Sequence, residues 1–527
     1  MLFVLLSYAL STLSPYLNGV FVDFLITNKS VERIVGFASV VAAIGITVAI
    51  LSYFAGMTTV KVSYNVAYLV LKDLIGTYEH ADLLFLEKLD ATYTTQRMFT
   101  DSNVVSKFVI GSFLSVPLNA LVAVFISTLF FIINPLLSLI ALSLAIAYFL
   151  LFWKARKPLY RASMTKKEAD STFFGAINSQ VDRVFDIQLR SDHNNSLTSL
   201  GLSFSSYFKS IVESSQITYL FSSADGVISA SFQAFLLIFS GIQIATGMMT
   251  VGEFTMVNAY FSQLLGCAKY FINFIQQYQD SKASYDRIQE ISLYPSRPEG
   301  DKSVDTITSI GIERLVFSYP SSGDANPQLI SNLSTSFEPN IVYAITGSNG
   351  CGKSTLLKLI AGLYDSGGAI TVDGLAFSEI SGSDLRRNHL SIVPQKLYAP
   401  KEPVGQFISC YLDEEISAVE HLLRNSGGPL SEYSTFILAR LSENCDSLSG
   451  GELRKLYLWL AVHKKYEVLI LDEPSTGLDL LGKTELIEFI SSIGKGRIVL
   501  IFTHDPDLIK ISHRILDLEA LLKNDRI

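Results

Sequence analysis

The sequence has 527 residues, of which 49% are hydrophobic and 17% are charged, and this combination is too long for one domain and too apolar for an ordinary soluble protein. The net charge of −8 and the lack of a basic block in the C-terminal half argue against nucleic-acid binding. The four cysteines follow no CxxC or Cys/His spacing, which argues against a disulfide framework or a zinc site.

Long uncharged runs lie almost entirely before Pro295, so we expect a membrane-embedded N-terminal half and a soluble C-terminal half. Each run is close to the ~20 residues that cross a bilayer. The first continues to Ile26 with no basic residue before it, which favours a spanning helix over a signal peptide. The predicted spans are 2–26, 35–60, 108–133, 136–153, 217–246 and 251–275.

Basic residues gather in the two long connections, after the second and the fourth span. The positive-inside rule places these connections and both termini in the cytoplasm. Their polar and apolar residues alternate periodically, which predicts helical hairpins with tips near 81–89 and 181–189; independent amphipathic loops are the alternative.

Most polar residues inside the predicted spans are neutral. Hydrogen bonds across a helix bundle explain such residues more readily than substrate contacts do. Asp225 is different, because an acid within an apolar segment is costly and often functional. It is either such an intramembrane acid or a residue at the cytoplasmic interface.

The segment "VYAITGSNGCGKSTLLKLIAGL" (342–363) predicts a strand, a glycine-rich turn and a helix. Gly347, Gly352, Lys353 and Ser354 fill the pattern G-x-x-x-x-G-K-[ST]. Backbone N–H groups of such a turn wrap a phosphate at a helix N-terminus, the lysine neutralises outer phosphates and the serine hydroxyl ligates Mg²⁺. The predicted nucleotide-binding residues are Gly347, Ser348, Asn349, Gly350, Cys351, Gly352, Lys353, Ser354 and Thr355.

A second apolar strand, within "YEVLILDEPSTGLD" (466–479), ends in two carboxylates. Asp472 suits a role at Mg²⁺ through a water molecule, and Glu473 is placed to polarise the attacking water. A helix cap or a surface pair is the alternative. The end of a parallel strand, where such sheets bind ligands, favours the catalytic interpretation.

Together with "LSGGE" (448–452), these two segments make residues 305–520 resemble the ATP-binding cassette (ABC) transporters. The resemblance implies a signature that acts on the ATP of a second copy, formed by Ser449, Gly450, Gly451 and Glu452. It further implies that Glu473 is catalytic together with His504 in "LIFTH", a switch residue that holds the γ-phosphate and the attacking water.

Three more positions match the family pattern. Tyr319 in "VFSYP" resembles the aromatic residue that stacks on adenine, with Phe317 as its competitor. Gln395 in "IVPQ" resembles the glutamine that contacts Mg²⁺, and Asp479 in "STGLD" fits the loop that crosses between the two sites.

The N-terminal half resembles the exporter branch of the family by its topology. The resemblance implies a type IV ABC exporter fold on a half-transporter chain, with an all-α transmembrane domain (1–292), a linker (293–304) and an α/β P-loop nucleotide-binding domain (305–527). It also implies coupling helices at the two hairpin tips. Glu443 resembles the exporter acid that meets a coupling helix, although "SENCDS" around it departs from the usual glycine-rich form.

Exporters of this branch usually carry a basic amphipathic helix before the first span, and this sequence begins at that span. Some peptide exporters also carry an N-terminal cysteine peptidase. Cleavage of a leader peptide is not expected of this sequence.

The expected function is ATP-driven export by alternating access across the bacterial plasma membrane, with ATP and Mg²⁺ bound at two composite sites of a dimer. The intact Glu473, Gly450, Gly451 and His504 favour a homodimer over a heterodimer. The fifth and sixth spans offer mainly Ser, Gln and Asn, with Lys269 as an exception, which favours a small bacteriocin-like peptide as the substrate. The alternatives are a lipid or drug exporter or flippase, a siderophore-type importer, and a membrane ATPase that transports nothing.

Overall fold

The structure is a computed structural model that describes residues 2–27, 31–297, 299–320, 328–425, 430–493 and 496–524. These residues form two compact units. The N-terminal unit contains Met1–Ala81 and Phe85–Pro295, and the C-terminal unit contains Asp82–Leu84 and Ser296–Ile527. The main division therefore falls inside the predicted linker 293–304.

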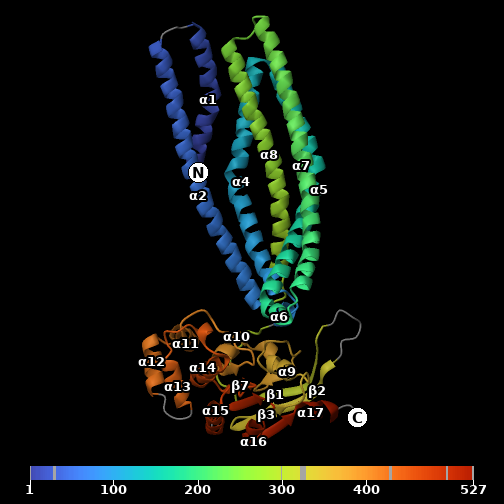
Figure 1. Cartoon of the computed structure of the whole chain (residues 1–527), viewed down its shortest axis with the longest axis vertical. Helices are drawn as coiled ribbons and strands as arrows, with labels where there is room; N and C mark the ends of the chain where they lie inside the picture. The colour runs from blue at the N-terminus through green and yellow to red at the C-terminus, as the bar shows by residue number, and fades with distance from the viewer. Residues whose placement is uncertain are drawn as a thin grey trace. The chain divides into compact units, whose positions relative to one another are not determined.

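The secondary structure of the N-terminal unit is almost entirely helical (Figure 1). Its long helices are α1 (Leu2–Thr27), α2 (Val31–His80), α4 (Ala91–Ile133), α5 (Pro135–Asp182), α7 (His193–Ala245) and α8 (Val251–Ser292). By length and composition, α1, α2, α4 and α7 are apolar and long enough to cross a membrane, and α5 begins with the shorter apolar stretch Pro135–Leu151. The described part of each predicted span lies within one long helix, apart from Thr246, the last residue of the fifth.

The long helices extend well beyond the apolar runs. Helix α2 continues to His80 and α4 begins at Ala91, while α5 continues to Asp182 and α7 begins at His193. The polar connections between the second and third and between the fourth and fifth apolar runs are therefore mostly helical. Two short helices, α3 (Leu83–Leu86) and α6 (Val184–Arg190), lie at the predicted tips.

Capping residues explain where several of these helices begin. The Asp90 side chain accepts a hydrogen bond from the Tyr93 N–H at the start of α4. Asn134 ends α4 and caps α5, in which Pro135 takes the first position, where proline loses no helical hydrogen bond. Thr250 forms a capping box at the start of α8.

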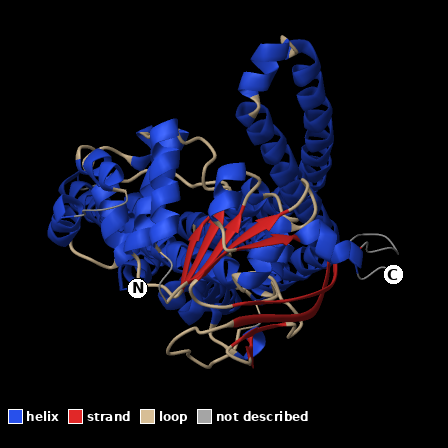
Figure 2. Ribbon diagram, turned by 90° about the horizontal axis from the view of Figure 1, so that it is seen from below, coloured by secondary structure: helices blue, strands red, loops and turns tan. Residues whose placement is uncertain are grey.

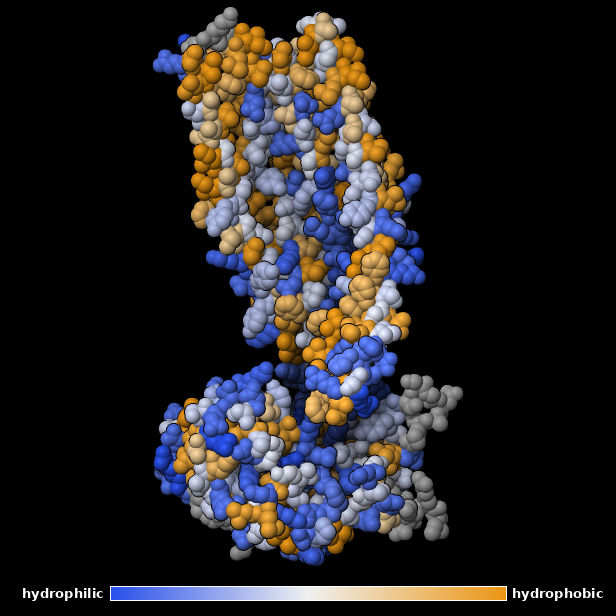
Figure 3. Space-filling view, in the orientation of Figure 1, coloured by the Kyte–Doolittle hydropathy of each residue, from blue (hydrophilic) through white to orange (hydrophobic). Residues whose placement is uncertain are grey.

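The surface of the N-terminal unit is unusually apolar. Hydrophobic residues cover much of the visible surface near the end that carries the α1–α2, α4–α5 and α7–α8 connections (Figure 3). Exposed large side chains there include Ile26, Ile132 and Met248. An apolar surface of this extent is typical of helices that lipid surrounds.

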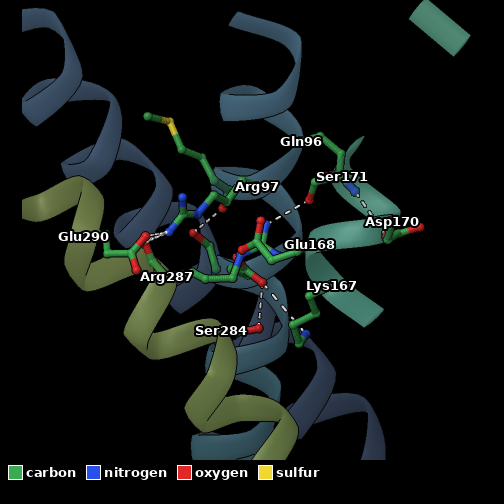
Figure 4. Close-up of polar contacts among 12 residues, drawn as sticks. Gln96, Arg97, Lys167, Glu168, Asp170, Ser171, Ser284, Arg287 and Glu290 are labelled. Carbon is green, nitrogen blue, oxygen red and sulfur yellow. Dashed lines mark hydrogen bonds and ion pairs between the residues drawn. The ribbon is translucent and has the colours of Figure 1, made fainter. Parts of the chain in front are cut away.

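A buried charge cluster joins α4, α5 and α8 outside the predicted spans (Figure 4). Asp101 Oδ2 lies 3.0 Å from Arg287 Nε, and both residues are 1% exposed. The Ser284 hydroxyl donates to Asp101 Oδ1 at 2.7 Å, and Arg287 Nη2 donates to the Ser171 hydroxyl at 2.9 Å. Lys167 lies between Asp101 and Asp280. Three helices are therefore tied together by groups that would be costly to bury without partners.

The C-terminal unit is built on a parallel sheet of five strands, and the strands of a second sheet lie beside it (Figure 2). Its strands, in spatial order, are β6 (Leu390–Val393), β7 (Val468–Asp472), β8 (Ile498–Phe502), β3 (Ile341–Thr346) and β9 (Arg514–Asp517). Antiparallel strands form a second sheet, in the order β2 (Gln328–Phe337), β1 (Ile310–Ser318), β4 (Ile370–Val372) and β5 (Leu375–Ala376).

Alternate residues of the parallel strands enter two separate hydrophobic cores. In β7, Ile470 packs into the core shared with the antiparallel sheet, and its neighbour Leu469 packs into the core on the opposite face. This period of two is expected of a strand that is buried on both faces. Among the described residues, the α-helices that lie entirely within this unit are α9 (Lys353–Ile360), α10 (Gly382–Asp384), α11 (Val404–Leu412), α12 (Ile416–Asn425), α13 (Ser431–Leu438), α14 (Gly450–His463), α15 (Leu480–Ser492), α16 (Pro506–Ile511) and α17 (Leu518–Asn524).

Candidate nucleotide-binding site

The predicted strand, turn and helix around residue 350 are present as β3, a loop and α9. Gly347 and Gly352 have φ values of 147° and 105°, which other residues rarely adopt. A Cβ atom on Gly347 would lie 2.7 Å from Sγ of Cys351. The loop is therefore tight enough to require glycine at these positions, and it leads directly into the N-terminus of α9.

The side chain of Lys353 folds back over this loop. Its Nζ donates to the carbonyl oxygens of Gly347 and Ser348 at 2.6 and 3.3 Å. Ser354, the next residue, is exposed at the start of α9. An ammonium group, an exposed hydroxyl and a helix N-terminus thus lie together, which is the arrangement that binds phosphate.

Glu473 and His504 meet at the ends of two neighbouring strands, β7 and β8. Nδ1 of His504 lies 2.8 Å from Oε1 of Glu473. The backbone N–H of Glu473 donates to the Phe502 carbonyl oxygen, and its φ is 48°, a strained value for a residue other than glycine. The side chain of Glu473 is 9% exposed, whereas that of His504 is 75% exposed. A buried acid is therefore held against an accessible imidazole.

Asp472 and Gln395 are connected through Arg454, a residue of α14. Nη2 of Arg454 donates to the Gln395 carbonyl oxygen at 2.7 Å, and its Nη1 lies 3.5 Å from the Asp472 carbonyl oxygen. Burial and the charge of Glu473 raise the pKa of Asp472, although Gln395, Arg454 and Lys353 act in the opposite direction. Sequence reasoning missed Arg454. The sequence signal that could have identified Arg454 is a charged residue in the otherwise mainly apolar helix that begins within LSGGE.

Tyr319 and Phe317, the two candidates for the stacking aromatic residue, differ in burial. Phe317 is 8% exposed and stacks on Tyr364 with ring centroids 5.5 Å apart, so it belongs to the core. Tyr319 is 39% exposed, and its hydroxyl lies 2.9 Å from that of Thr355 in α9. Tyr319 is therefore the residue that can offer a ring to a ligand beside the phosphate loop.

Ser449 and Glu452 form a capping box at the start of α14. The Ser449 N–H donates to Oε2 of Glu452 at 2.8 Å, and the Glu452 N–H lies 3.4 Å from Oγ of Ser449. A Cβ atom on Gly451 would lie 2.5 Å from the Gly477 carbonyl oxygen, whereas nothing lies within 4 Å of a Cβ on Gly450. The space beside Gly450 is therefore unoccupied, and we call this side of the signature its open face.

Comparison with known families agrees with this geometry. Residues 1–267 match the ABC transporter transmembrane region, and residues 330–476 match the ABC transporter family. The chain belongs to the ABC transporters.

Relatives of this transporter have different described substrates. An ATP-dependent lipid A-core flippase of Burkholderia pseudomallei is 28% identical over 292 residues, which cover 54% of this chain and 49% of the relative. A lactococcin-A transport/processing ATP-binding protein of Lactococcus lactis is 22% identical over 434 residues, which cover 79% and 58%. The transporter thus spans about half the length of the curated relatives that it matches.

A solved structure shares the fold of the whole chain. The structure of a bacterial Atm1-family ABC exporter with ATP bound has a TM-score of 0.86 and 18% identity, and it covers 100% of this chain and 95% of its own. The type IV exporter fold, with a helical transmembrane region before the cassette, is therefore confirmed. We call the C-terminal unit the cassette from here on.

In this transporter Asp479 caps α15 and contacts α14. Oδ1 of Asp479 accepts the Gly482 N–H at 3.0 Å and lies 3.2 Å from Nζ of Lys455. Glu443, the predicted coupling acid, lies 3.5 Å from Nη1 of Arg440, whose Nη2 lies 3.1 Å from Glu452. Both residues thus connect to the signature helix within the cassette.

Asp225 is a buried residue of α7 with partners on α5 and α7. The Tyr148 hydroxyl donates to Oδ1 of Asp225 at 2.7 Å and lies 2.9 Å from the Ser229 hydroxyl. Asp225 is 9% exposed. Hydrogen bonds across the bundle therefore account for at least one of its oxygen atoms.

Proposed function

We propose that two copies of this transporter bind and hydrolyse ATP at two composite sites. The observation that carries the proposal is the pairing of Glu473 with His504 at 2.8 Å. Strands β7, β8 and β3 are parallel neighbours, so their C-terminal ends place this pair and the phosphate loop at one edge of the sheet.

Each proposed role follows from a position in the cassette. Lys353 neutralises the outer phosphates, because it already extends along the loop that would hold them. Glu473 polarises the attacking water, and His504 orients it together with the γ-phosphate. Tyr319 stacks on adenine. Positioning and electrostatic stabilisation supply most of the catalysis.

Residues that fit Mg²⁺ surround the same edge. Ser354 is exposed at the start of α9, and burial disfavours the charge of Asp472 until a cation compensates it. Ser354 and Gln395 would hold the ion directly and Asp472 through water. Bound Mg²⁺ would neutralise charge on the phosphate oxygens.

The open face of the signature supports a dimer, and we favour a homodimer. Ser449 with the amides of Gly450 and Gly451 stands at the positive end of α14, which suits a γ-phosphate held by Lys353 of the opposite copy. Asp479 would cross between the two sites. One chain would then supply complementary halves of both sites.

We further propose six spans in the bacterial plasma membrane, with both termini in the cytoplasm. The six long helices and the basic residues of the two long connections support this topology. Helices α3 and α6 would be the coupling helices. Phe185 and Leu189 of α6 are more than two-thirds exposed, which suits a docking element.

The proposed activity is export of a small peptide by alternating access. The lactococcin-A transport protein supports a peptide, because its alignment with 79% of this chain must include much of the transmembrane region as well as the cassette. A lipid substrate is the second candidate, and the lipid A-core flippases of higher identity favour it.

Measurements on the purified full-length transporter, reconstituted in lipid, test both parts of the proposal, the ATP hydrolysis and the transported substrate. We expect basal ATP hydrolysis, its stimulation by small cationic or apolar peptides, and ATP-dependent peptide uptake into inside-out vesicles. Stimulation by lipid A precursors instead would favour the flippase. Hydrolysis that no substrate stimulates would argue against transport, and absence of hydrolysis by this chain alone would contradict the homodimer.

A further inference from the structure

Lys483 joins helix α15 to the segment that follows His504. Its Nζ lies 3.0 Å from Oδ2 of Asp505 and 2.7 Å from Oδ2 of Asp507. Asp505 is the residue after His504, and it caps α16 by accepting the Asp507 N–H at 3.0 Å. One ammonium group therefore holds both carboxylates of the turn in which His504 lies.

Asp505 is fixed from several directions. Its N–H donates to the Thr503 hydroxyl at 3.0 Å. Although burial acts to raise the pKa of Asp505, hydrogen bonds from Lys483 and Ser475 bring it below its ordinary value. The Asp505 side chain is 14% exposed, so its ion pair with Lys483 is better protected from solvent than an ordinary surface pair.

The other end of this connection is Asp479, four residues before Lys483. The Lys483 N–H donates to the Asp479 carbonyl oxygen at 2.9 Å in the first turn of α15. The Asp479 carboxylate in turn lies 3.2 Å from Nζ of Lys455, on the helix that begins with the signature. A continuous series of contacts therefore runs from α14 through α15 to Asp505, the residue after His504.

We propose that Lys483 is a positioning residue for His504, and that it makes the placement of His504 depend on the position of Asp479. This inference rests on the proposed function, in which the signature of a chain acts at one site of the dimer while its His504 acts at the other. A displacement of Asp479 when the two cassettes close would move the first turn of α15. Lys483 would transmit that displacement to Asp505 and thus to the neighbouring His504.

Lys510 provides a matched control. It is a lysine near the same turn, and its Nζ lies 3.6 Å from Oδ1 of Asp507. Its side chain is 76% exposed, against 27% for Lys483, and it belongs to α16 itself. Removing Lys510 changes the local charge as much as removing Lys483 does, but it leaves the connection from α15 to Asp505 in place.

The experiment measures kcat and KM for ATP hydrolysis by the full-length reconstituted transporter. The variants are Lys483→Met, Lys483→Arg, Lys510→Met, Asp505→Asn and the double variant Lys483→Met/Asp505→Asn. We expect Lys483→Met to lower kcat about tenfold and to leave KM within about twofold, because a misplaced catalytic group slows turnover without weakening binding. Lys483→Arg should restore most of kcat, and Lys510→Met should match the wild type.

The double variant and thermal unfolding separate positioning from stability. If Lys483 acts through Asp505, the double variant should lose no more activity than the more impaired single variant. All variants should retain the rise in unfolding temperature that ATP produces in the wild type. An unchanged kcat in Lys483→Met would overturn the inference, as would a loss that Lys510→Met shares or that only tracks the unfolding temperature. Absence of hydrolysis in the wild type would contradict the proposed function itself.

Discussion

Oε1 of Glu473 lies 2.8 Å from Nδ1 of His504, although 31 residues separate them in the sequence. The pairing of β7 with β8 brings them together, because Asp472 and Phe502 are register partners at the ends of the two strands. Glu473 follows Asp472 directly and His504 is two residues after Phe502, so the pairing of the two strands brings the backbones of both residues to the same edge of the sheet.

Replacing Glu473 by Gln should abolish turnover and retain ATP binding. The carboxamide keeps the shape of the side chain but cannot accept a proton, so kcat should fall by about 10²–10⁴-fold. ATP hydrolysis and ATP-dependent thermal stabilisation of the full-length transporter measure the two effects. Glu467→Gln is the matched control, since Glu467 also pairs with a histidine, His389, at 2.7 Å. Hydrolysis at the wild-type rate by Glu473→Gln would remove Glu473 from the mechanism.

Alanine substitutions at the two signature glycines should impair different properties, stability for Gly451 and turnover for Gly450. Gly451→Ala places a Cβ atom 2.5 Å from the Gly477 carbonyl oxygen, so it should destabilise the isolated chain by about 1–3 kcal/mol. Gly450→Ala meets nothing within 4 Å, so it should leave the unfolding temperature unchanged. It should nevertheless lower kcat about tenfold or more if a partner's phosphate approaches this face. Wild-type kcat in Gly450→Ala would contradict the composite site.

Glu452 should make the stability of the signature helix depend on pH. Hydrogen bonds from the backbone and side chain of Ser449 lower the pKa of Glu452 below its ordinary value. The stability that ionised Glu452 contributes to the folded protein is therefore fully present above the ordinary pKa of about 4.3. It is lost as pH falls through the lowered pKa. Glu452→Gln preserves a capping acceptor without the charge. The wild type should unfold at a higher temperature than this variant near pH 6, and the difference should shrink progressively as pH falls below the ordinary pKa of a glutamate. A constant difference across this range would rule out the charge as its cause.

Removing one member of the Asp101–Arg287 pair should destabilise the transmembrane unit more than removing both members does. Asp101→Asn or Arg287→Met leaves a buried group without its partner, which should destabilise the transmembrane unit by about 3–5 kcal/mol. The double variant Asp101→Leu/Arg287→Met should recover much of this loss. Unfolding temperatures in detergent measure all three. Lys302→Gln, which breaks an exposed pair with Glu379, is the control and should cost less than about 1 kcal/mol. Additive losses in the double variant would mean that the two side chains act independently.

The local structure of the cassette could be predicted closely because its candidate site residues lie in short segments. The glycine-rich turn, the strand that ends in Asp472 and the strand before His504 each carry their own pattern, and each has the expected structure. Whether a single side chain is buried cannot be predicted from such a local pattern. Only the structure shows that Phe317 packs on Tyr364 and that Tyr319 is more exposed.

Contacts between distant segments were the part that the sequence could not predict. Arg287 of α8 meets Asp101 of α4 although two other long helices, α5 and α7, lie between them in the sequence, and neither residue belongs to a motif. Arg454 and Lys483 were missed for the same reason, because their roles depend on carbonyl and carboxylate groups that the fold brings from other strands and helices. The sequence predicts that an acid at Asp225 is costly to bury, but its hydrogen bond with Tyr148 depends on the packing of α5 against α7.

The capping box of α14 also determines which hydrogen-bond donors the signature has left. A helix begins with backbone N–H groups that lack partners inside the helix. Glu452 accepts the N–H of Ser449, and the Ser449 oxygen accepts the N–H of Glu452. The amides of Gly450 and Gly451 stay outside this exchange. Ser449 and Glu452 thus satisfy each other's hydrogen bonds. The backbone N–H groups that remain belong to Gly450 and Gly451, which have no side chain that could block an approaching anion.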